Sequence, residues 1–456
     1  MTEFTRSEIE SAIGAKQEGA VAEKFTDITT DTRKITPNSL FIALKGEKFN
    51  GEDFAFEAVE KGAAGVVVSL DCSKKLNEKG AIFKVPDTLS AYQKIARAWR
   101  MRFDVPVIAI TGSNGKTTTK ELVAAALCPI GAIHKTAANF NNEVGLPLTL
   151  LGINEHHKAV VVEIGMRGLH QIENLAPIAA PNIGIVTNVG ETHIELLGSI
   201  ENIAKAKCEL VEAIPAGGAV ILNRDDKFVY DMRNKANDNV KVVTYGIHND
   251  ADVKAVDIRA DGLNTNFKVV FGGKSYDYEL PMAGEHNVYN ALAAIAAGLY
   301  LGVSNEDMRK ALSVATNAKM RFEVSEKDGV TFINDAYNAS PLSMRAALST
   351  LSKTYRGRKI ARLGDMFELG KEEEAAHKKV GEEVAEFGID VLITLGERAK
   401  LIAKGAKSKG VTNVTSVNTH IEAADALKEI IKRGDTVLIK GSRGMEMEKV
   451  LEFMKY

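Results

Sequence analysis

The sequence predicts an α/β protein of three domains, in which mostly parallel sheets are covered by helices. Three observations support this prediction. The chain has 456 residues, which is too long for a single hydrophobic core. Continuous apolar runs alternate with helical segments through its middle part, as in a parallel sheet buried on both faces. A glycine-containing loop joins one such run to a helix, in the stretch VIAITGSNGKTTTKEL.

The composition is that of an ordinary globular protein, with 45% hydrophobic and 26% charged residues. The formal net charge of −2 creates no general attraction for nucleic acid or for an anionic membrane, so neither is expected as a partner. The chain has no apolar run of about 18 residues and no signal-like amino terminus. Its three cysteines, Cys72, Cys128 and Cys208, are far apart and favour a reducing compartment. We therefore expect a cytoplasmic protein.

The first domain is predicted over residues 1–103 as a small α/β unit. Two short strand-like runs, Phe41–Gly46 and Ala64–Leu70, lie on either side of the helix-like stretch DFAFEAVEKGA.

The central domain is predicted over residues 104–317, with helices on both faces of a mostly parallel sheet. Its strands are expected in the apolar runs VIAI, AVVVEIG, IGIVTNV and AVILN. The stretch FKVVFGGKSYDYEL alternates polar and apolar residues around Gly272 and Gly273, which predicts a hairpin added to this sheet. The helix NVYNALAAIAAGLYLG would close the domain.

The last domain, residues 318–456, is predicted as a Rossmann-like α/β unit. Three strand-like runs, KIARLGD, DVLITLG and DTVLIKGS, each end in a glycine, at Gly364, Gly396 and Gly441. Ligands of open parallel sheets bind beyond the carboxyl ends of the strands, so these glycines indicate a ligand-binding edge. No G-x-G-x-x-G follows any strand, so dinucleotide binding is only weakly indicated.

The glycine-containing loop, T-G-S-N-G-K-T from Thr111 to Thr117, predicts a phosphate site. It is shorter than the common G-x-x-x-x-G-K-[ST] pattern, whose first glycine would fall at Ile110. Gly112 and Gly115 permit positive φ, so that backbone N–H groups can turn toward an anion. Lys116 would neutralise the outer phosphates, and the Thr117 hydroxyl would suit Mg²⁺. The alternative is an ordinary turn with a solvated lysine.

Further polar side chains follow the neighbouring strands. Glu163 ends one apolar run and suits Mg²⁺ or a water molecule, unless it is a surface or capping residue. His193 follows the next run, where a structural role is equally plausible. Lys205 and Lys207 lie two residues apart on a helix, so only one of them can face the site, and the residues alone leave open which.

Amide and cationic groups are expected around a nucleotide. Asn287 and Asn290 lie three apart at a helix start, where they could contact a nucleotide or where Asn287 could serve as a cap. Near the junction of the last two domains stand four further candidates, Arg321, Asp335, Tyr337 and Asn338. A cation there could reach a nucleotide when the domains close.

Eight motifs in order, spread over nearly the whole chain, resemble the Mur ligase family, the ATP-dependent amide ligases of peptidoglycan precursor synthesis. They are TGSNGKTTTKE, NFNNEVGLPLTLL, EIGMRG, TNVGETHIELLGS, AKAKCEL, GEHNVYNALAA, MRFE and NDAYNASPLSM. Within the family, TTDTRKITPNSLFIALKGEKFNGEDF and LGDMFELG favour a ligase that joins D-alanyl-D-alanine to a UDP-N-acetylmuramoyl-tripeptide.

The resemblance implies a role for each candidate residue. Lys116, His193 and Lys207 would be catalytic, and Lys207 would carry CO₂ as a carbamate. ATP would be bound by Gly112, Ser113, Asn114, Gly115, Lys116, Thr117, Thr118, Asn287, Asn290, Arg321, Asp335, Tyr337 and Asn338. Mg²⁺ and the second metal would be held by Thr117, Glu163, His193 and Lys207. Thr30, Asp31 and Arg33 would contact the UDP end of one substrate, and Ser442 and Arg443 the dipeptide.

The implied enzyme phosphorylates the tripeptide carboxylate with ATP, and the dipeptide amine then attacks the acyl phosphate. A monomer is expected. One rival is a sister ligase that adds a diamino acid to a UDP-linked dipeptide or glutamate to a folate. The diamino-acid ligases typically carry D-N-P-R in the last domain, and the chain has none. Another rival is a nucleotide-gated binding protein or motor, which would use the loop without ligation.

Overall fold

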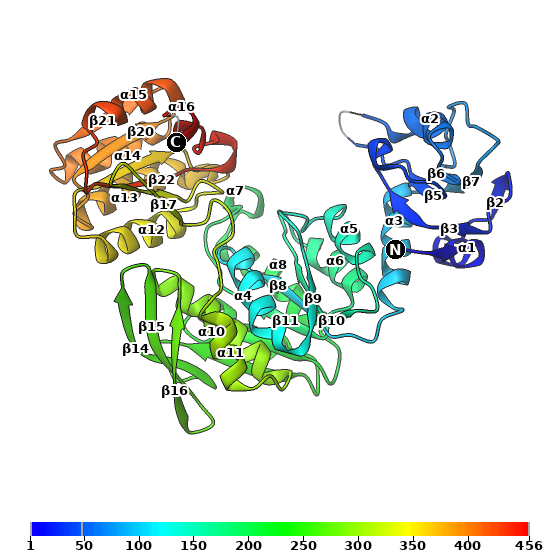
Figure 1. The fold of residues 1–456 in the computed structure, drawn as a ribbon, viewed down its shortest axis with the longest axis horizontal. Coiled ribbons are helices and arrows are strands. Elements are labelled where there is room, and N and C mark those ends of the chain that lie inside the picture. The colour runs from blue at the N-terminus through cyan, green and yellow to red at the C-terminus, as the bar shows by residue number, and fades with distance from the viewer. Residues whose placement is uncertain (1, 47–48, 455–456) are drawn as a thin grey trace. The chain divides into compact units, whose positions relative to one another are not determined.

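The computed structural model describes residues 2–46 and 49–454, and it is an α/β structure with three principal sheets (Figure 1). Its contacts divide the chain into two compact units. One unit holds most of the first 109 residues together with Gly131–Gly165 and Glu173–Asn182. The other holds Ile110–Ile130, Met166–Ile172 and the chain from Ile183 onward. The predicted fold class, mixed α/β with mostly parallel sheets, is confirmed.

The amino-terminal region contains a five-stranded sheet in the order β2-β7-β6-β5-β4. All its pairs are parallel except β2 with β7. Its strands are β2 (Gln17–Gly19), β4 (Asp27–Thr29), β5 (Ser39–Ile42), β6 (Gly65–Ser69) and β7 (Ala81–Val85). A separate two-stranded sheet joins β1 (Phe4–Thr5) to β3 (Lys24–Phe25). The helices of the region are α1 (Arg6–Ile13), α2 (Ala55–Glu60) and α3 (Thr88–Arg100). Phe41, Val66 and Val68 pack with Ala55 and Ala58 of α2, because the apolar strand residues need a helix to cover them.

The largest sheet has nine strands, in the order β16-β15-β14-β13-β12-β11-β8-β10-β9. Parallel pairing runs from β11 to β14 and also joins β9 to β10. The hairpin predicted around Gly272 and Gly273 is confirmed, since β15 and β16 pair antiparallel with Phe271 opposite Lys274. The strands are β8 (Val107–Thr111), β9 (Ala132–Lys135), β10 (His157–Glu163), β11 (Ile183–Val186), β12 (Ala219–Asn223), β13 (Lys241–Gly246), β14 (Val253–Asp261), β15 (Asn264–Phe271) and β16 (Lys274–Leu280).

The helices of this region include the predicted closing helix, α10. Its alanine-rich face is buried and packs against α4, because small side chains let two helices approach closely. The helices are α4 (Lys116–Leu127), α5 (Gly145–Leu151), α6 (Gln171–Ala179), α7 (Ile194–Leu197), α8 (Ile200–Glu212), α9 (Lys227–Asp231), α10 (Glu285–Tyr300) and α11 (Asn305–Leu312).

The carboxy-terminal sheet has six strands in the order β17-β18-β22-β19-β20-β21, parallel except for β17. Its strands are β17 (Glu323–Lys327), β18 (Val330–Asn334), β19 (Lys359–Gly364), β20 (Val391–Leu395), β21 (Val414–Val417) and β22 (Thr436–Lys440). The predicted glycines end β19 or directly follow β20 and β22.

Helices cover both faces of this sheet (Figure 1). Leu438 of β22 belongs to a core with α12 (Pro341–Thr354), α13 (Glu373–Glu386) and α14 (Ala399–Ser408). Its neighbours Val437 and Ile439 belong to the opposite core, with α15 (His420–Ile430) and α16 (Lys449–Phe453). Successive strand residues point to opposite faces, so a continuous apolar run serves both cores.

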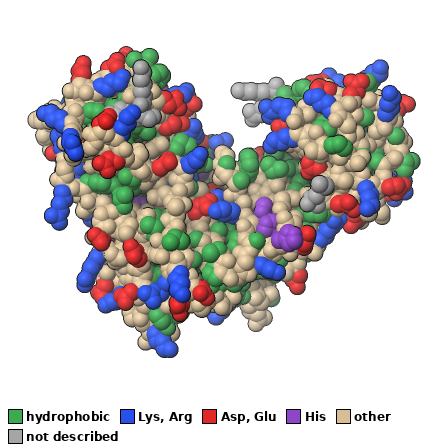
Figure 2. Space-filling model, in the orientation of Figure 1, with side chains coloured by type: hydrophobic (Ala, Val, Ile, Leu, Met, Phe, Trp, Pro, Cys, Tyr) green, Lys and Arg blue, Asp and Glu red, His purple; other side chains and the backbone are tan. Residues whose placement is uncertain are grey.

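The surface is mixed in charge, with acidic and basic side chains interspersed over the face seen in Figure 2. Among residues 2–46 and 49–454, no helix combines the length and the apolar character that crossing a bilayer requires.

Candidate functional site

The phosphate loop consists of the four residues between β8, which ends at Thr111, and α4, which begins at Lys116. Gly112 and Gly115 adopt φ values of 150° and 84°, as their predicted role requires. A Cβ atom on Gly112 would collide with the Thr187 hydroxyl, and one on Gly115 would lie 2.6 Å from Asn290 Oδ1. Both positions therefore need glycine for backbone conformation and for space.

The segment after β11 fixes the shape of the loop. Asn114 N–H donates to Asn188 Oδ1 at 2.9 Å, and the Thr187 hydroxyl donates to the Asn114 carbonyl at 2.6 Å. Ser113 donates through its hydroxyl to the Gly190 carbonyl at 3.0 Å. Thr187 and Asn188 were not singled out from the sequence, although they lie in the motif TNVGETH. The loop is thus held in place by side chains before any ligand binds.

Lys116 and Thr117 open α4 beside the loop. Lys116 Nζ donates to the Gly112 carbonyl at 2.6 Å, so this lysine folds back over the loop. Thr117 is buried, and its hydroxyl accepts a hydrogen bond of 2.9 Å from Arg321 Nη2. Thr118, the next residue of α4, is also buried.

The two asparagines of α10 lie on one face, as predicted, and link α10 to α4. Asn290 Oδ1 accepts from the Thr119 hydroxyl at 3.0 Å, and Asn290 Nδ2 donates to Asn287 Oδ1 at 3.2 Å. Asn287 Nδ2 in turn donates to the Ala283 carbonyl at 2.8 Å. The structure therefore brings Asn290 to the loop, and places Asn287 one hydrogen bond further away.

Arg321 and Tyr337 come together as the sequence suggested. The guanidinium of Arg321 lies over the Tyr337 ring, 4.0 Å from its centroid. Arg321 Nε is buried and finds no acceptor among the described residues. A buried donor of this kind suits an anionic ligand.

Asp335 and Asn338 are bound to a lysine that the sequence did not single out. Lys440 is buried, and its ammonium donates to Asp335 Oδ2 at 2.7 Å and to the Asn338 carbonyl at 3.0 Å. Asp335 Oδ1 also accepts from the Phe322 N–H at 3.1 Å. Asp335 therefore connects Phe322, the residue after Arg321, to Lys440 at the end of β22.

Ser340 connects the carboxy-terminal sheet to the phosphate loop. Its hydroxyl caps α12 by accepting from Ser343 N–H, and it also donates to Asn114 Oδ1 at 3.0 Å. Asn114 Nδ2 remains a buried donor with no acceptor in the described part of the chain.

His193 and Lys207 lie within electrostatic reach of Lys116. Burial lowers the pKa of His193; the Glu368 carboxylate, which contacts Nδ1, opposes this shift, while Lys116 and Lys207 add to it. Complete burial lowers the pKa of Lys207 well below its usual range, and the charge of Lys116 acts in the same direction. Lys205 on the same helix is exposed, so Lys207 is the lysine that faces inward.

Glu163 ends β10 in the other compact unit. It is buried, its Oε1 accepts from Asn141 Nδ2 at 2.8 Å, and its N–H donates to the Thr136 hydroxyl at 3.0 Å. The described residues contain no group of three or more His, Cys, Asp and Glu side chains that could hold a metal ion.

Thr30, Asp31 and Arg33 lie in one turn after β4. Arg33 donates to both carboxylate oxygens of Asp31, at 2.9 and 2.8 Å, and its side chain is 85% exposed. These hydrogen bonds lower the pKa of Asp31 far below its usual range.

Ser442 and Arg443 differ in their surroundings. Ser442 is buried; its N–H donates to the Asp365 carbonyl, and its hydroxyl accepts from Phe367 N–H, both at 2.9 Å. Arg443 is exposed and forms an ion pair of 2.7 Å with Glu448. A 3₁₀ turn, Arg443–Met445, follows β22, and α16 begins at Lys449.

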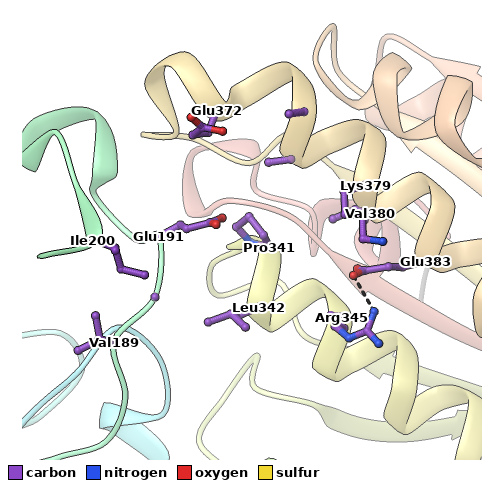
Figure 3. Close-up of a pocket in the computed structure, with 13 residues that line it drawn as sticks. Val189, Glu191, Ile200, Pro341, Leu342, Arg345, Glu372, Lys379, Val380 and Glu383 are labelled. Carbon is purple, nitrogen blue, oxygen red and sulfur yellow. Dashed lines mark hydrogen bonds and ion pairs between the residues drawn. The ribbon is translucent and has the colours of Figure 1, made fainter. Parts of the chain in front are cut away.

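A cavity of about 480 Å³ lies beside Glu191, between the segment after β11 and helices α12 and α13 (Figure 3). Val189, Ile200, Pro341 and Leu342 give it an apolar wall. Its other wall is charged and includes the ion pair of Arg345 with Glu383.

Three family models match this chain in succession. They are the Mur ligase family catalytic domain over residues 24–100, the Mur ligase middle domain over 110–298 and the Mur ligase glutamate ligase domain over 320–443. The fold and the phosphate loop define a nucleotide-binding type of α/β enzyme. The chain belongs to the Mur ligase family.

Its relatives match over nearly their full length. UDP-N-acetylmuramoyl-tripeptide–D-alanyl-D-alanine ligase of Bacillus subtilis is 40% identical, covering 93% of this chain and 92% of the relative. The ligase of the same name from Escherichia coli is 32% identical, covering 100% of this chain and 99% of the relative.

Solved structures agree with these matches. MurF from Acinetobacter baumannii has a TM-score of 0.92 at 30% identity, covering 100% of this chain and 99% of its own. MurF from Thermotoga maritima, solved in complex with ADP, has a TM-score of 0.85 at 26% identity and covers 94% and 97% of the two chains. Folylpolyglutamate synthase of Mycobacterium tuberculosis has a TM-score of 0.63 at 16% identity over 80% and 94% of the two chains, so it shares the fold.

Proposed function

We propose that this ligase joins D-alanyl-D-alanine to UDP-N-acetylmuramoyl-tripeptide with ATP, in cytoplasmic peptidoglycan precursor synthesis. The observation that carries the proposal is the match over 93% to 100% of the chain to relatives that bear this name. The rival activities fit less well. The 2,6-diaminopimelate ligase of the family has only 18% identity, and the folate ligase 16%.

The reaction has two steps. The tripeptide's terminal carboxylate oxygen attacks the γ-phosphorus of ATP, the bond to ADP breaks, and an acyl phosphate forms. The dipeptide amine then attacks the acyl carbon, the amide bond forms, and phosphate leaves with its bonding electrons while the amine loses a proton. The protein's contribution is to align these groups and to offset the charge on the phosphates.

Residues around the phosphate loop would bind the triphosphate. Gly112 to Thr118 supply backbone N–H groups and the start of α4, and Lys116 supplies a positive charge. Asn114 Nδ2 and Arg321 Nε are buried donors left without acceptors in the described residues, which fits an anionic ligand in this place. Asn290, Tyr337 and the Lys440-bound Asp335 and Asn338 would complete the nucleotide site, with Asn287 supporting Asn290.

Mg²⁺ fits a site of this composition, because it prefers oxygen ligands and commonly takes only one or two from the protein. Thr117, Glu163 and His193 would hold the metal ions, which would supply charge neutralisation for the phosphates. Lys207 would carry the carbamate. Burial lowers the pKa of Lys207 well below its usual range, which favours the neutral amine, and the neutral amine is the form that reacts with CO₂.

We further propose that each predicted domain binds a different substrate. Residues 1–103 would bind the UDP substrate, with Thr30, Asp31 and the exposed Arg33 near the uridine end. Residues 104–317 would bind ATP, and residues 318–456 would bind the dipeptide through Ser442 and Arg443. The enzyme would act as a monomer.

The test is a phosphate-release assay over a matrix of UDP-peptides and amines, with the product identified by mass spectrometry. Phosphate release that requires both the tripeptide and D-alanyl-D-alanine, with a product of the summed mass less water, supports the proposal. Lys116→Ala should abolish this signal without changing thermal unfolding. Turnover with a diamino acid and a UDP-dipeptide, or phosphate release without any amine, would contradict it.

A further inference from the structure

Several hydrogen bonds anchor the loop Asp365–Leu369, which follows β19. Met366 N–H donates to His377 Nε2 at 3.0 Å, and Phe367 N–H donates to the Ser442 hydroxyl at 2.9 Å. Ser442 N–H donates in return to the Asp365 carbonyl at 2.9 Å. The loop is therefore tied both to α13 and to the end of β22.

His377 is an anchor with only one suitable protonation state. The side chain is completely buried, and Nδ1 lies 2.7 Å from the Glu373 carbonyl, which can only accept a hydrogen. Nε2 must then be the acceptor for Met366 N–H, so the ring is neutral. The His377 ring therefore cannot change its tautomer without losing one of these two hydrogen bonds. It holds the loop at Met366 in one position.

Glu368 lies at the tip of the loop and is turned toward α7. Its φ of 62° is uncommon for a residue other than glycine, and such conformations persist where the surroundings impose them. Its carbonyl accepts from Glu195 N–H at 3.3 Å. One carboxylate oxygen contacts His193 Nδ1, and the other lies 3.7 Å from Arg167 Nη2.

The partner, His193, is held in a similar way. Its φ is 65°, and it forms the N-cap of α7 without a side-chain capping bond. The imidazole is thus released from helix capping and directed to Glu368. His193 and Glu368, 175 positions apart in the chain, both have a left-handed backbone conformation, and their side chains are in contact.

A carboxylate can only accept, so this contact places the hydrogen of a neutral His193 on Nδ1 and leaves the lone pair on Nε2. An imidazole oriented in this way presents Nε2 to a cation or to a proton. We propose that Glu368 is a positioning residue, which fixes the ring orientation and tautomer of His193 from a loop of the carboxy-terminal sheet. The inference rests on the proposed function only in taking His193 as a member of the reaction site.

The experiment compares Glu368→Gln with Glu374→Gln, a substitution of an exposed carboxylate at the start of α13. Long-range ¹H–¹⁵N spectra of the histidine rings give the tautomer of His193 in the free enzyme, with His193→Gln to assign the signals. Wild type and Glu374→Gln should show the Nδ1–H form. Glu368→Gln should lose this preference, because an amide can donate as well as accept.

Kinetics supply the second readout. Glu368→Gln should lower kcat by about 10- to 100-fold, the usual cost of losing a carboxylate that orients a metal-binding or catalytic histidine, with the KM for ATP changed less than about twofold. An Nε2–H tautomer in the wild type, or an unchanged tautomer in Glu368→Gln, would overturn the inference. The spectra are recorded without substrates. A failure of ligation with every substrate pair would therefore count against the proposed function and leave the tautomer result standing.

Discussion

Arg321 Nη2 donates a hydrogen bond of 2.9 Å to the Thr117 hydroxyl, so the first turn of α4 is linked to a residue 204 positions later in the chain. The same guanidinium lies over the Tyr337 ring, 4.0 Å from its centroid. A planar cation can use its edge for hydrogen bonds and its face for an aromatic ring at once. The link therefore prepares a positive group beside the phosphate loop.

Arg321→Ala should raise the KM for ATP by about 10-fold or more, since a charge-assisted hydrogen bond contributes about 1.5–3 kcal/mol. Arg321→Lys should restore only part of this loss, because an ammonium cannot stack and donate in the same geometry. Initial-rate kinetics with varied ATP measure both values. Arg309→Ala, an exposed arginine on α11, is the control and should match wild type. A KM for ATP that stays at the wild-type value in Arg321→Ala would remove this residue from the nucleotide site.

Lys207→Ala should lower ligation by about 10- to 100-fold, the cost expected when a group that tunes a metal site is removed. Formate or acetate should restore part of the activity, because either can replace the anion that a carbamate would supply. Lys205→Ala is the matched control, since Lys205 lies on the same helix with its side chain exposed. Equal losses from both substitutions, or no rescue by either acid, would argue against a carbamate on Lys207.

Arg443→Ala should raise the KM for D-alanyl-D-alanine more than the KM for ATP, because lost binding of one substrate appears in that substrate's KM. Because Arg443 forms an ion pair with Glu448, removing the Glu448 charge should have the opposite effect on the dipeptide KM. Glu448→Gln should lower the dipeptide KM, since it releases Arg443 from a competing carboxylate. Arg433→Ala, exposed before β22, serves as the control. If the KM for D-alanyl-D-alanine stays unchanged in both Arg443→Ala and Glu448→Gln, Arg443 does not bind the dipeptide carboxylate.

Asp435 should stabilise the carboxy-terminal sheet in a pH-dependent way. Burial raises the pKa of this carboxyl, but hydrogen bonds from Arg358 and from Lys432 N–H outweigh burial and lower it. A pKa that is lower in the folded state contributes stability above the unfolded value of about 3.9, and the contribution is lost as the pH falls through the folded value.

Asp435→Asn should therefore lower the opening free energy of β19 and β22 by about 1–3 kcal/mol near neutral pH, with a smaller difference below about pH 4. Hydrogen exchange of the amides in these two strands measures it. Asp425→Asn, which changes an exposed carboxylate on α15, should have little effect at any pH. A loss in Asp435→Asn that is equal at pH 7 and pH 3.5 would contradict the assignment.

The sequence predicted those parts of the fold that have local signals. The runs that became β8, β10 and β12 are apolar because both faces of each strand are covered, and the hairpin at Gly272 has its own turn residues. Strand β9 escaped notice because its residues AIHK are exposed or half-exposed at an edge. Strand β14 was likewise missed, since its outer half is polar and exposed.

The site was predictable to the same extent. The phosphate loop carries its chemistry in consecutive residues, so its glycines and Lys116 could be recognised. Which of Lys205 and Lys207 points inward could be decided only once the orientation of α8 was known. Glu368 and Lys440 were missed because their partners, His193 and Asp335, lie 175 and 105 positions away. Nothing in a single sequence pairs such residues.

The Ser340 hydroxyl uses its lone pair on Ser343 N–H and its hydrogen on Asn114 Oδ1. Aspartate and asparagine are good helix caps, but a carboxylate has no hydrogen to give, and an amide would have to cap with its oxygen and reach Asn114 with its nitrogen from a longer side chain. Only serine and threonine meet both demands with one atom. Random mutagenesis of codon 340, followed by selection for growth, should accordingly return only serine and threonine. This set is smaller than the set of residues that can cap a helix.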